Sequence, residues 1–231
     1  MFSHTPVYGT SLPPNTLCLT FDDGPGETIG DGPGPKTLKI AEYLASENIQ
    51  ATFFMVGRHI VQYPDVLPRV FEAGHIIGNH AFTHHRTFTE LLERQWDYFS
   101  EIELTDKLIA KYLRNNDIYF RAPWGDFPPA VAEGLNKALG DQFNHIGSFM
   151  WDVGAGDWNY WQNERSAEEC AQYYFNEINE KNHGIVLMHD STSDLLNAKN
   201  NNLTYETIRI LIPELKRQGY QFVNLDFRKW Y

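Results

Sequence analysis

Short runs of apolar and β-branched residues alternate along the chain with longer stretches in which apolar positions recur at helical spacing. Strands that alternate with amphipathic helices are typical of repeated βα units, whose strands form a largely parallel sheet. Seven runs have the character of strands: residues 17–21, 51–56, 75–79, 119–122, 145–153, 184–189 and 221–225. The pattern therefore predicts an α/β fold.

The stretches between these runs predict helices over residues 35–47, 65–72, 87–113, 128–139, 166–181 and 204–217. Thr87 and Glu90 form the sequence pattern of a capping box at one helix start. A Gly-rich segment, residues 26–34, is expected to be a loop. No linker, repeat or low-complexity tract divides the chain, so we expect a single domain over residues 1–231.

The amino-acid composition indicates which classes of molecule the protein is expected to bind. The 231 residues are 42% hydrophobic, which is ample for one large core. A net charge of -11 without any Lys/Arg-dense patch argues against nucleic acid, because phosphate binding needs clustered cations. Aromatic residues make up 14% of the chain and would suit stacking on sugar rings, although most of them are expected in the core.

The cysteines and the N-terminal residues give an expectation for the cellular compartment of the protein. Cys18, one of two cysteines, lies in an apolar run and is expected to be a buried free thiol, with no disulfide framework. The N-terminus has no signal-peptide pattern, and no run approaches the ~20 apolar residues of a membrane span. The chain as written is expected to be cytoplasmic, or extracytoplasmic if a leader has been removed. Nothing in the sequence indicates an oligomeric state.

Two adjacent carboxylates, Asp22 and Asp23, end the first predicted strand directly before Gly24-Pro25. One of them could hold a metal while the other works as a base, but such a string is also common in ordinary turns. His80 and His84 lie four residues apart and could complete a metal site with one of the aspartates.

Other polar or aromatic residues also follow predicted strands, and in a parallel barrel the carboxyl ends of the strands meet at one face, where such folds carry their sites. Taken alone, each has an ordinary interpretation, such as a surface arginine, a hydrogen-bonded structural histidine or a core tryptophan. These strand-end residues are Arg121 to Trp124, Asp152, Asp157, Trp158, His189 and Asp190.

Five ordered motifs resemble the polysaccharide deacetylases of carbohydrate esterase family 4, also called the NodB homology domain. They are Thr-Phe-Asp-Asp-Gly-Pro at 20–25, His-Ala-Phe-Thr-His at 80–84, Arg-Ala-Pro-Trp at 121–124, Trp-Asp-Val-Gly-Ala-Gly-Asp-Trp at 151–158 and Ile-Val-Leu-Met-His at 185–189. The resemblance spans nearly the whole chain. It implies a distorted (β/α) barrel of about seven parallel strands, TIM-barrel-like, that hydrolyses N- or O-acetyl groups of a glycan such as chitin, peptidoglycan or xylan.

The resemblance also implies one divalent metal held by Asp23, His80 and His84. Two imidazoles and one carboxylate suit Zn²⁺, the expected ion, and Co²⁺ shares this ligand set. Asp22 resembles the family's general base, which takes a proton from the attacking water, and Arg121 resembles the partner that keeps this base ionised and oriented.

His189 resembles the general acid that protonates the leaving group, and the resemblance favours Asp157 over Asp190 or Asp152 as its partner. The backbone N–H of Trp124, after Pro123, is expected to meet the negative charge that develops on the acetyl oxygen. The residues expected to contact substrate are Pro123, Trp124, Trp158 and Leu187.

Several positions depart from the family pattern. Ala81 stands where a Ser or Thr is common, so we expect the loop between the histidines to be braced by other groups. Gly154 stands where an Asp is frequent, and the 26–34 loop is longer than usual and is expected to affect substrate entry. His85 is an extra imidazole, expected to face solvent or to lie next to the ligands.

Two other functions are alternatives to a metal-dependent deacetylase. A metal-independent hydrolase of small cyclic amides, of the allantoinase-like type, would tend to lack the complete metal triad. A catalytically silent carbohydrate-binding relative would be expected to have degenerate motifs. The intact base, acid and ligand positions favour a metal-dependent deacetylase over both.

Overall fold

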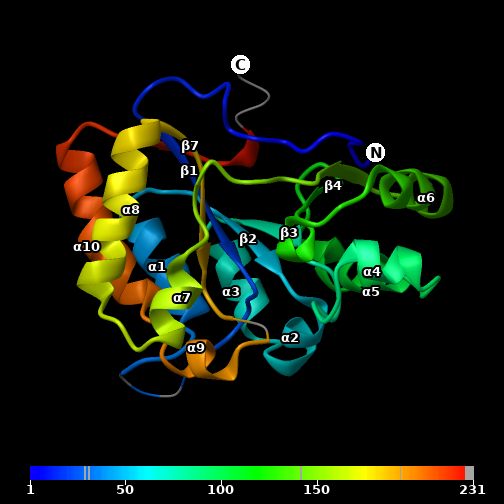
Figure 1. Cartoon of the computed structure of the whole chain (residues 1–231), viewed down its shortest axis with the longest axis horizontal. Coiled ribbons are helices and arrows are strands. Elements are labelled where there is room, and N and C mark those ends of the chain that lie inside the picture. The colour runs from blue at the N-terminus through cyan, green and yellow to red at the C-terminus, as the bar shows by residue number, and fades with distance from the viewer. Residues whose placement is uncertain (29, 31, 141, 193, 227–231) are drawn as a thin grey trace.

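The computed structural model describes residues 1–28, 30, 32–140, 142–192 and 194–226. In these residues the strands form one parallel sheet in the order β5-β4-β3-β2-β1-β7-β6, with β8 paired to β1. Figure 1 labels the strands β7, β1, β2, β3 and β4 of this sheet. The expected distorted barrel is confirmed. The strands are β1 (Thr16–Asp22), β2 (Thr52–Met55), β3 (Ile76–Asn79), β4 (Asp117–Phe120), β5 (Asn144–Gly147), β6 (Val153–Gly154), β7 (His183–His189) and β8 (Gln221–Val223).

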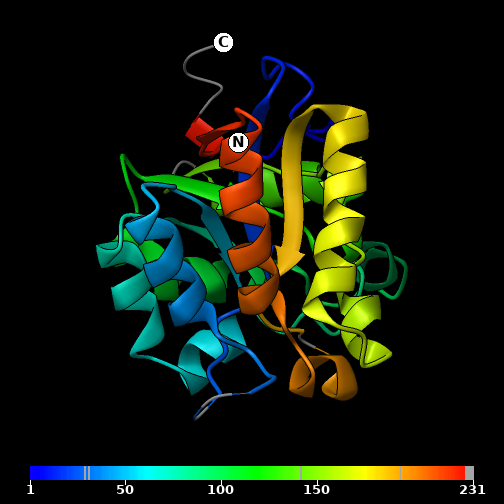
Figure 2. The ribbon, with the colours of Figure 1, turned by 90° about the vertical axis from the view of Figure 1, so that its left-hand side faces the viewer.

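Helices cover the outside of the sheet, and α8 and α10 lie side by side there (Figure 2). Their apolar faces pack on the strands, which is the arrangement that amphipathic periodicity predicts. The helices are α1 (Thr37–Ser46), α2 (Gly57–Gln62), α3 (Val66–Glu72), α4 (Phe88–Glu93), α5 (Phe99–Ile109), α6 (Pro129–Leu139), α7 (Asp157–Gln162), α8 (Ala167–Lys181), α9 (Leu196–Asn200) and α10 (Thr204–Arg217).

The central strand β1 sets the register of the site. All seven of its residues are buried, so both of its faces are covered, and its middle residues, Leu17 to Leu19, are apolar. Asp22, its last residue, lies opposite His189 of β7 and Phe54 of β2. The strand pairing itself therefore brings a carboxylate and an imidazole to the same edge of the sheet.

The predicted strand over residues 145–153 is wrong, because the structure divides it into β5 and β6, which lie at opposite ends of the strand order. Gly147 adopts a φ of 128°, a backbone conformation that glycine tolerates best, and the chain leaves β4 there. After the crossing, the Asp152 N–H bonds the Ile185 carbonyl of β7. Within the described ranges no ladder joins β5 to β6, so the barrel is incomplete on this side.

The predicted helix over residues 87–113 is two helices, α4 and α5. Gln95 has a φ of 56°, which ends the first helix, and the Asp97 carboxylate accepts hydrogen bonds from the Phe99 and Ser100 N–H groups at the start of the second. Of the predicted capping box, the Thr87 half is present, since its hydroxyl accepts from the Glu90 N–H, while the Glu90 carboxylate pairs with Arg86 and Arg94.

Both cysteines are buried free thiols, as expected for Cys18. No described helix has the length and the apolar character that crossing a bilayer would require.

Candidate active site

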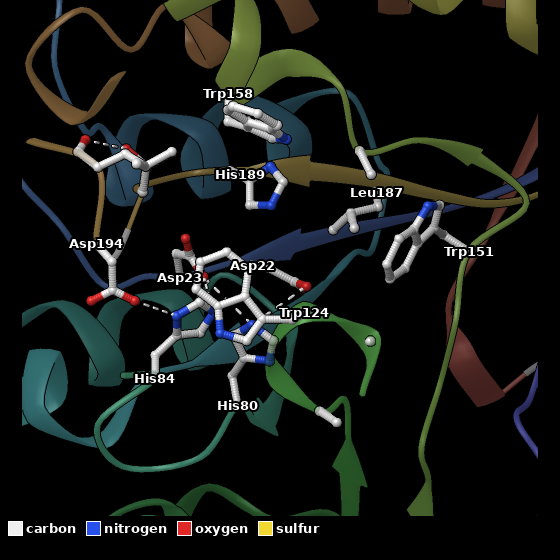
Figure 3. Close-up of a pocket in the computed structure, with 15 residues that line it drawn as sticks. Asp22, Asp23, His80, His84, Trp124, Trp151, Trp158, Leu187, His189 and Asp194 are labelled. Carbon is white, nitrogen blue, oxygen red and sulfur yellow. Dashed lines mark hydrogen bonds and ion pairs between the residues drawn. The ribbon is translucent and has the colours of Figure 1, made fainter. Parts of the chain in front are cut away.

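A cavity of about 230 Å³ opens at the carboxyl ends of the strands (Figure 3). Its lining contains eight of the residues proposed from the sequence: Asp22, Asp23, His80, His84, Trp124, Trp158, Leu187 and His189. It also contains Ala122, Trp151 and Ala155, which stand in the sequence motifs without an assigned role, and four residues that sequence reasoning missed: Gly125, Thr192, Asp194 and Leu195.

Asp23, His80 and His84 form a compact buried cluster at the base of the cavity. Asp23 Oδ1 lies 3.2 Å from His84 Nε2 and 3.5 Å from His80 Nε2. One ligand atom from each residue lies within 4.8 Å of the other two. Two imidazole nitrogens and one carboxylate oxygen are a donor set that suits Zn²⁺ or a neighbouring transition metal, so these residues fit the expected ion.

The second nitrogen of each imidazole explains how the rings are oriented. His80 Nδ1 donates to the Arg121 carbonyl oxygen at 2.8 Å, and His84 Nδ1 donates to Asp194 Oδ2 at 2.7 Å. Because these oxygens accept, each Nδ1 carries a proton and each ring turns its Nε2 toward Asp23.

The backbone of Asp23 is also held in place. Its φ of 76° is unusual for a residue other than glycine and costs of order 1–3 kcal/mol. His59 Nδ1 donates to the Asp23 carbonyl oxygen at 2.7 Å, and burial lowers the pKa of His59 to about 4, so this ring is neutral at pH 7. Sequence reasoning gave His59 no role, because nothing in its spacing indicates this contact.

Gly24, the next residue, allows the chain to pass close to β7. A Cβ at Gly24 would lie 2.2 Å from Asp190 Oδ2, so only glycine fits this approach.

The two imidazoles change the pKa of the Asp23 carboxyl group. Burial alone would raise its pKa, but the charge of His84 and the contacts with His80 lower the pKa well below its ordinary value.

Arg121 and Asp22 form a buried ion pair beside this cluster. Arg121 Nη1 donates to Asp22 Oδ1 and to the Thr20 hydroxyl, both at 2.8 Å. The other nitrogens of the guanidinium donate to the Phe149 and Met150 carbonyls at 3.2 and 3.1 Å. Arg121 is thus fully buried rather than a surface arginine, and its position fixes that of Asp22.

His189 lies on the opposite wall of the cavity and pairs with Asp157. His189 Nδ1 donates to Asp157 Oδ1 at 2.7 Å, and the His189 backbone N–H donates to Asp157 Oδ2, also at 2.7 Å. Asp152 instead accepts from the backbone of Gly9 and Ile185. Burial would lower the pKa of His189, but the Asp157 carboxylate outweighs it and raises this pKa to about 10.

Tryptophans border the mouth of the cavity, and Figure 3 shows Trp158 next to His189 and Trp151 next to Leu187. Trp124 is 55% exposed and Trp158 39% exposed, so neither is an ordinary core residue. The Trp124 ring lies 5.0 Å from that of His84.

Leu187 is buried but still lines the cavity. Pro123 is buried in the turn that carries Trp124, outside the cavity lining that the described residues form.

The departures from the family pattern have local explanations. Gly154 has a φ of 93°, and a Cβ there would lie 2.4 Å from the Tyr174 ring, so an Asp does not fit this backbone. His85 contacts Arg58 and Asp194 and is also more than half exposed, so both expectations for it hold. Two residues of the 26–34 loop, 29 and 31, lie outside the described residues.

Asp194 is the most informative residue that the sequence analysis missed. It follows β7 in the same connection as His189 and Asp190, and its carboxylate orients the ring of His84. The strand-end rule that selected His189 would also have selected Asp194 if it had been extended along this connection.

Comparisons with known proteins give one consistent family. The polysaccharide deacetylase profile matches residues 9–140. The chain is 28% identical over 208 residues to a peptidoglycan-N-acetylglucosamine deacetylase of Bacillus cereus, covering 88% of this chain and 67% of the relative. It is 30% identical over 213 residues to the peptidoglycan-N-acetylmuramic acid deacetylase PdaA of Bacillus subtilis, covering 91% and 70%. It spans only 38% of the length of the Listeria monocytogenes relative PgdA.

A solved structure shows the same fold. The Bc1960 peptidoglycan N-acetylglucosamine deacetylase superposes with a TM-score of 0.70 at 24% identity, covering 95% of this chain and 89% of that one. The resemblance found in the five motifs is therefore confirmed, because the profile matches more than half of the chain. This chain belongs to the polysaccharide deacetylase family, a family of carbohydrate esterases.

Proposed function

We propose that this protein removes N-acetyl groups from peptidoglycan-type glycans and that it needs one divalent metal, most simply Zn²⁺, to do so. The observation that carries the proposal is one cavity with an arginine-bound carboxylate on one side and a carboxylate-bound imidazole on the other. The Asp23, His80 and His84 cluster lies in the same cavity. The choice of N-acetyl and of peptidoglycan is supported by the names of the relatives.

Asp23, His80 and His84 would hold the metal through Oδ1 and the two Nε2 atoms. A metal bound by three protein ligands polarises a carbonyl and lowers the pKa of water, which is the chemistry that amide hydrolysis needs. The protons on His80 Nδ1 and His84 Nδ1 point away from the cluster, so neither ring has to turn to bind an ion.

Asp22 acts as the general base. Its Oδ1 is bound by Arg121, while Oδ2 lies 3.6 Å from His80 Nε2, next to the proposed ligands. The guanidinium holds the carboxylate in place and keeps it from turning toward the ligand cluster. Asp22 Oδ2 would accept a proton from the water that attacks the acetyl carbonyl.

His189 acts as the general acid. Its Nδ1 is held by Asp157, which leaves Nε2 as the atom that can give a proton to the leaving amine. The raised pKa, to about 10, keeps the ring protonated at neutral pH. Leu187 and Trp158 would border the acetyl methyl group. The backbone N–H of Trp124 would donate to the acetyl oxygen, on which negative charge develops.

Two readouts test the proposal. Zinc-loaded protein should release acetate from peptidoglycan, and chelation should abolish this release. The activity should be weaker on chitooligosaccharides and acetylxylan. A folded, zinc-loaded protein that releases no acetate from any of the three would contradict the proposal and favour a silent carbohydrate-binding relative, while full activity without metal would favour the cyclic-amide type.

Asp22→Asn tests the base. This variant should keep its zinc, because Asp22 is not among the proposed ligands, while kcat falls by about 10²–10⁴-fold. A near-normal kcat in Asp22→Asn would show that another group is the base.

A further inference from the structure

We propose that Glu101 of α5 is a positioning residue for the metal site, because it holds the loop between His80 and His84 in the shape that brings the two rings together. The inference rests on the metal site of the proposed function. Glu101 lies outside the cavity lining formed by the described residues and would act only through the loop.

One carboxylate binds two successive residues of this loop. Glu101 Oε2 accepts from the Phe82 N–H at 3.0 Å and the Thr83 N–H at 2.8 Å, and Oε1 accepts from the Thr83 hydroxyl at 2.7 Å. Hydrogen bonds to an ionised acceptor are stronger than neutral ones. Thr83 directly precedes His84, so these bonds act on the backbone that carries the second imidazole.

The loop also needs a restraint from outside. Ala81 and His84 have φ values of 63° and 61°, in the left-handed region that residues with a Cβ rarely occupy. A segment with two such residues relaxes unless its surroundings hold it. Ala81 has no side-chain hydroxyl that could stabilise the loop from within.

A second element holds the opposite polar groups of the same loop. The N–H groups of Gly57 and Arg58, at the start of α2, donate to the carbonyls of Ala81 and Phe82 at 2.9 Å each. The Ala81 and Phe82 carbonyls are thus bound by α2, and the Phe82 and Thr83 N–H groups are bound by Glu101 of α5. Loss of Glu101 would leave two buried or half-buried N–H groups of the loop without this acceptor.

The consequence for an ion is specific. When the loop relaxes, His84 Nε2 loses its fixed position opposite Asp23 Oδ1. Zinc binding must then order the loop again, which lowers the affinity for zinc. Residues that orient metal ligands typically affect metal affinity by about 10–100-fold. Glu101→Ala should therefore weaken zinc binding by this factor, while kcat at saturating zinc stays close to that of the wild type.

The experiment measures zinc dissociation constants by competition with a chromophoric chelator, using zinc alone as the probe. Glu103 provides the matched control, since it lies on the same helix and pairs with Lys107 at the surface. Glu103→Ala should bind zinc as the wild type does. Glu101→Gln should bind nearly as well, because its amide oxygen can accept both N–H groups and the Thr83 hydroxyl can rotate.

Each outcome decides the inference. Unchanged zinc affinity in Glu101→Ala, or equal weakening in Glu103→Ala, overturns it. A lower thermal midpoint of the metal-free Glu101→Ala protein with unchanged zinc affinity also overturns it, since that result describes a structural role only. If Glu101→Ala does not fold, the shorter Glu101→Asp is judged by the same criterion. A wild type that binds no zinc would instead refute the metal site itself, together with the proposed function.

Discussion

Two histidine–aspartate pairs face each other across the cavity, and the distance from ring nitrogen to carboxylate is the same in both. His84 Nδ1 lies 2.7 Å from Asp194, and His189 Nδ1 lies 2.7 Å from Asp157. Their surroundings differ. Asp194 also binds Arg58 at 2.9 Å and is partly exposed, whereas the buried Asp157 has the His189 N–H as its other close partner.

This difference shows that the role of a histidine–aspartate pair depends on two things. One is which other groups bind the carboxylate, and the other is which groups face the Nε2 atom of the histidine. The charge of Asp194 is shared with a guanidinium, and His84 Nε2 faces a carboxylate and a second imidazole, as a metal ligand does. The charge of Asp157 acts on His189 without such a cation and raises the pKa of its ring to about 10, as a general acid requires.

The largest expected effect is the difference in zinc content between variants of His84 and of His189. His84→Ala should lose zinc and all measurable acetate release, because one of the three proposed ligands is gone. His189→Ala should keep its zinc while kcat falls by about 10²–10⁴-fold. Zinc content after desalting, together with acetate release, distinguishes them, and loss of zinc from His189→Ala would end the distinction between the pairs.

A smaller effect is expected from Asp157→Asn. His189 works as an acid while it is protonated, so activity is lost as pH rises through its pKa. Removing the charge that raises this pKa should move the alkaline limb of the kcat profile to lower pH, by about 1–3 units. The profile is measured at saturating zinc, and an alkaline limb that stays in place would contradict the assignment of Asp157.

The smallest effect is expected from Asp194→Asn. The amide oxygen can still accept from His84 Nδ1, but the ring loses the charged partner that orients it, so zinc affinity should fall about tenfold. The alkaline limb should not move, because His189 is on the other wall. Chelator competition and the same pH profile check both points, and a shift like that of Asp157→Asn would mean that the pairs are not distinct.

The residues proposed to bear chemistry could be predicted from the sequence because they lie at strand ends, where alternation of strands and helices predicts convergence. Asp22, Asp23 and His189 were proposed in this way, and Arg121 and Asp157 were proposed as partners of Asp22 and His189. The groups that orient His84 and its loop were not predicted, because Asp194 is 110 residues from His84 and Glu101 is 18 residues from Thr83, and no periodicity links such positions.

Backbone conformation explains the other errors. An apolar run indicates burial but not where a chain leaves the sheet, so residues 145–153 looked like one strand. The positive φ of Asp23, Ala81 and His84 was equally invisible, because none of these residues is a glycine.

Arg121 has a second consequence for the architecture. Its donors bind Asp22 and also the carbonyls of Phe149 and Met150, in the segment that crosses between β5 and β6 where no described ladder closes the sheet. The Arg121 side chain thus provides hydrogen bonds to carbonyls that a neighbouring strand would otherwise bind. Lysine, with one ammonium group, cannot reach all these acceptors at once. Replacing Arg121 should therefore disturb both the proposed base, Asp22, and the segment that crosses between β5 and β6.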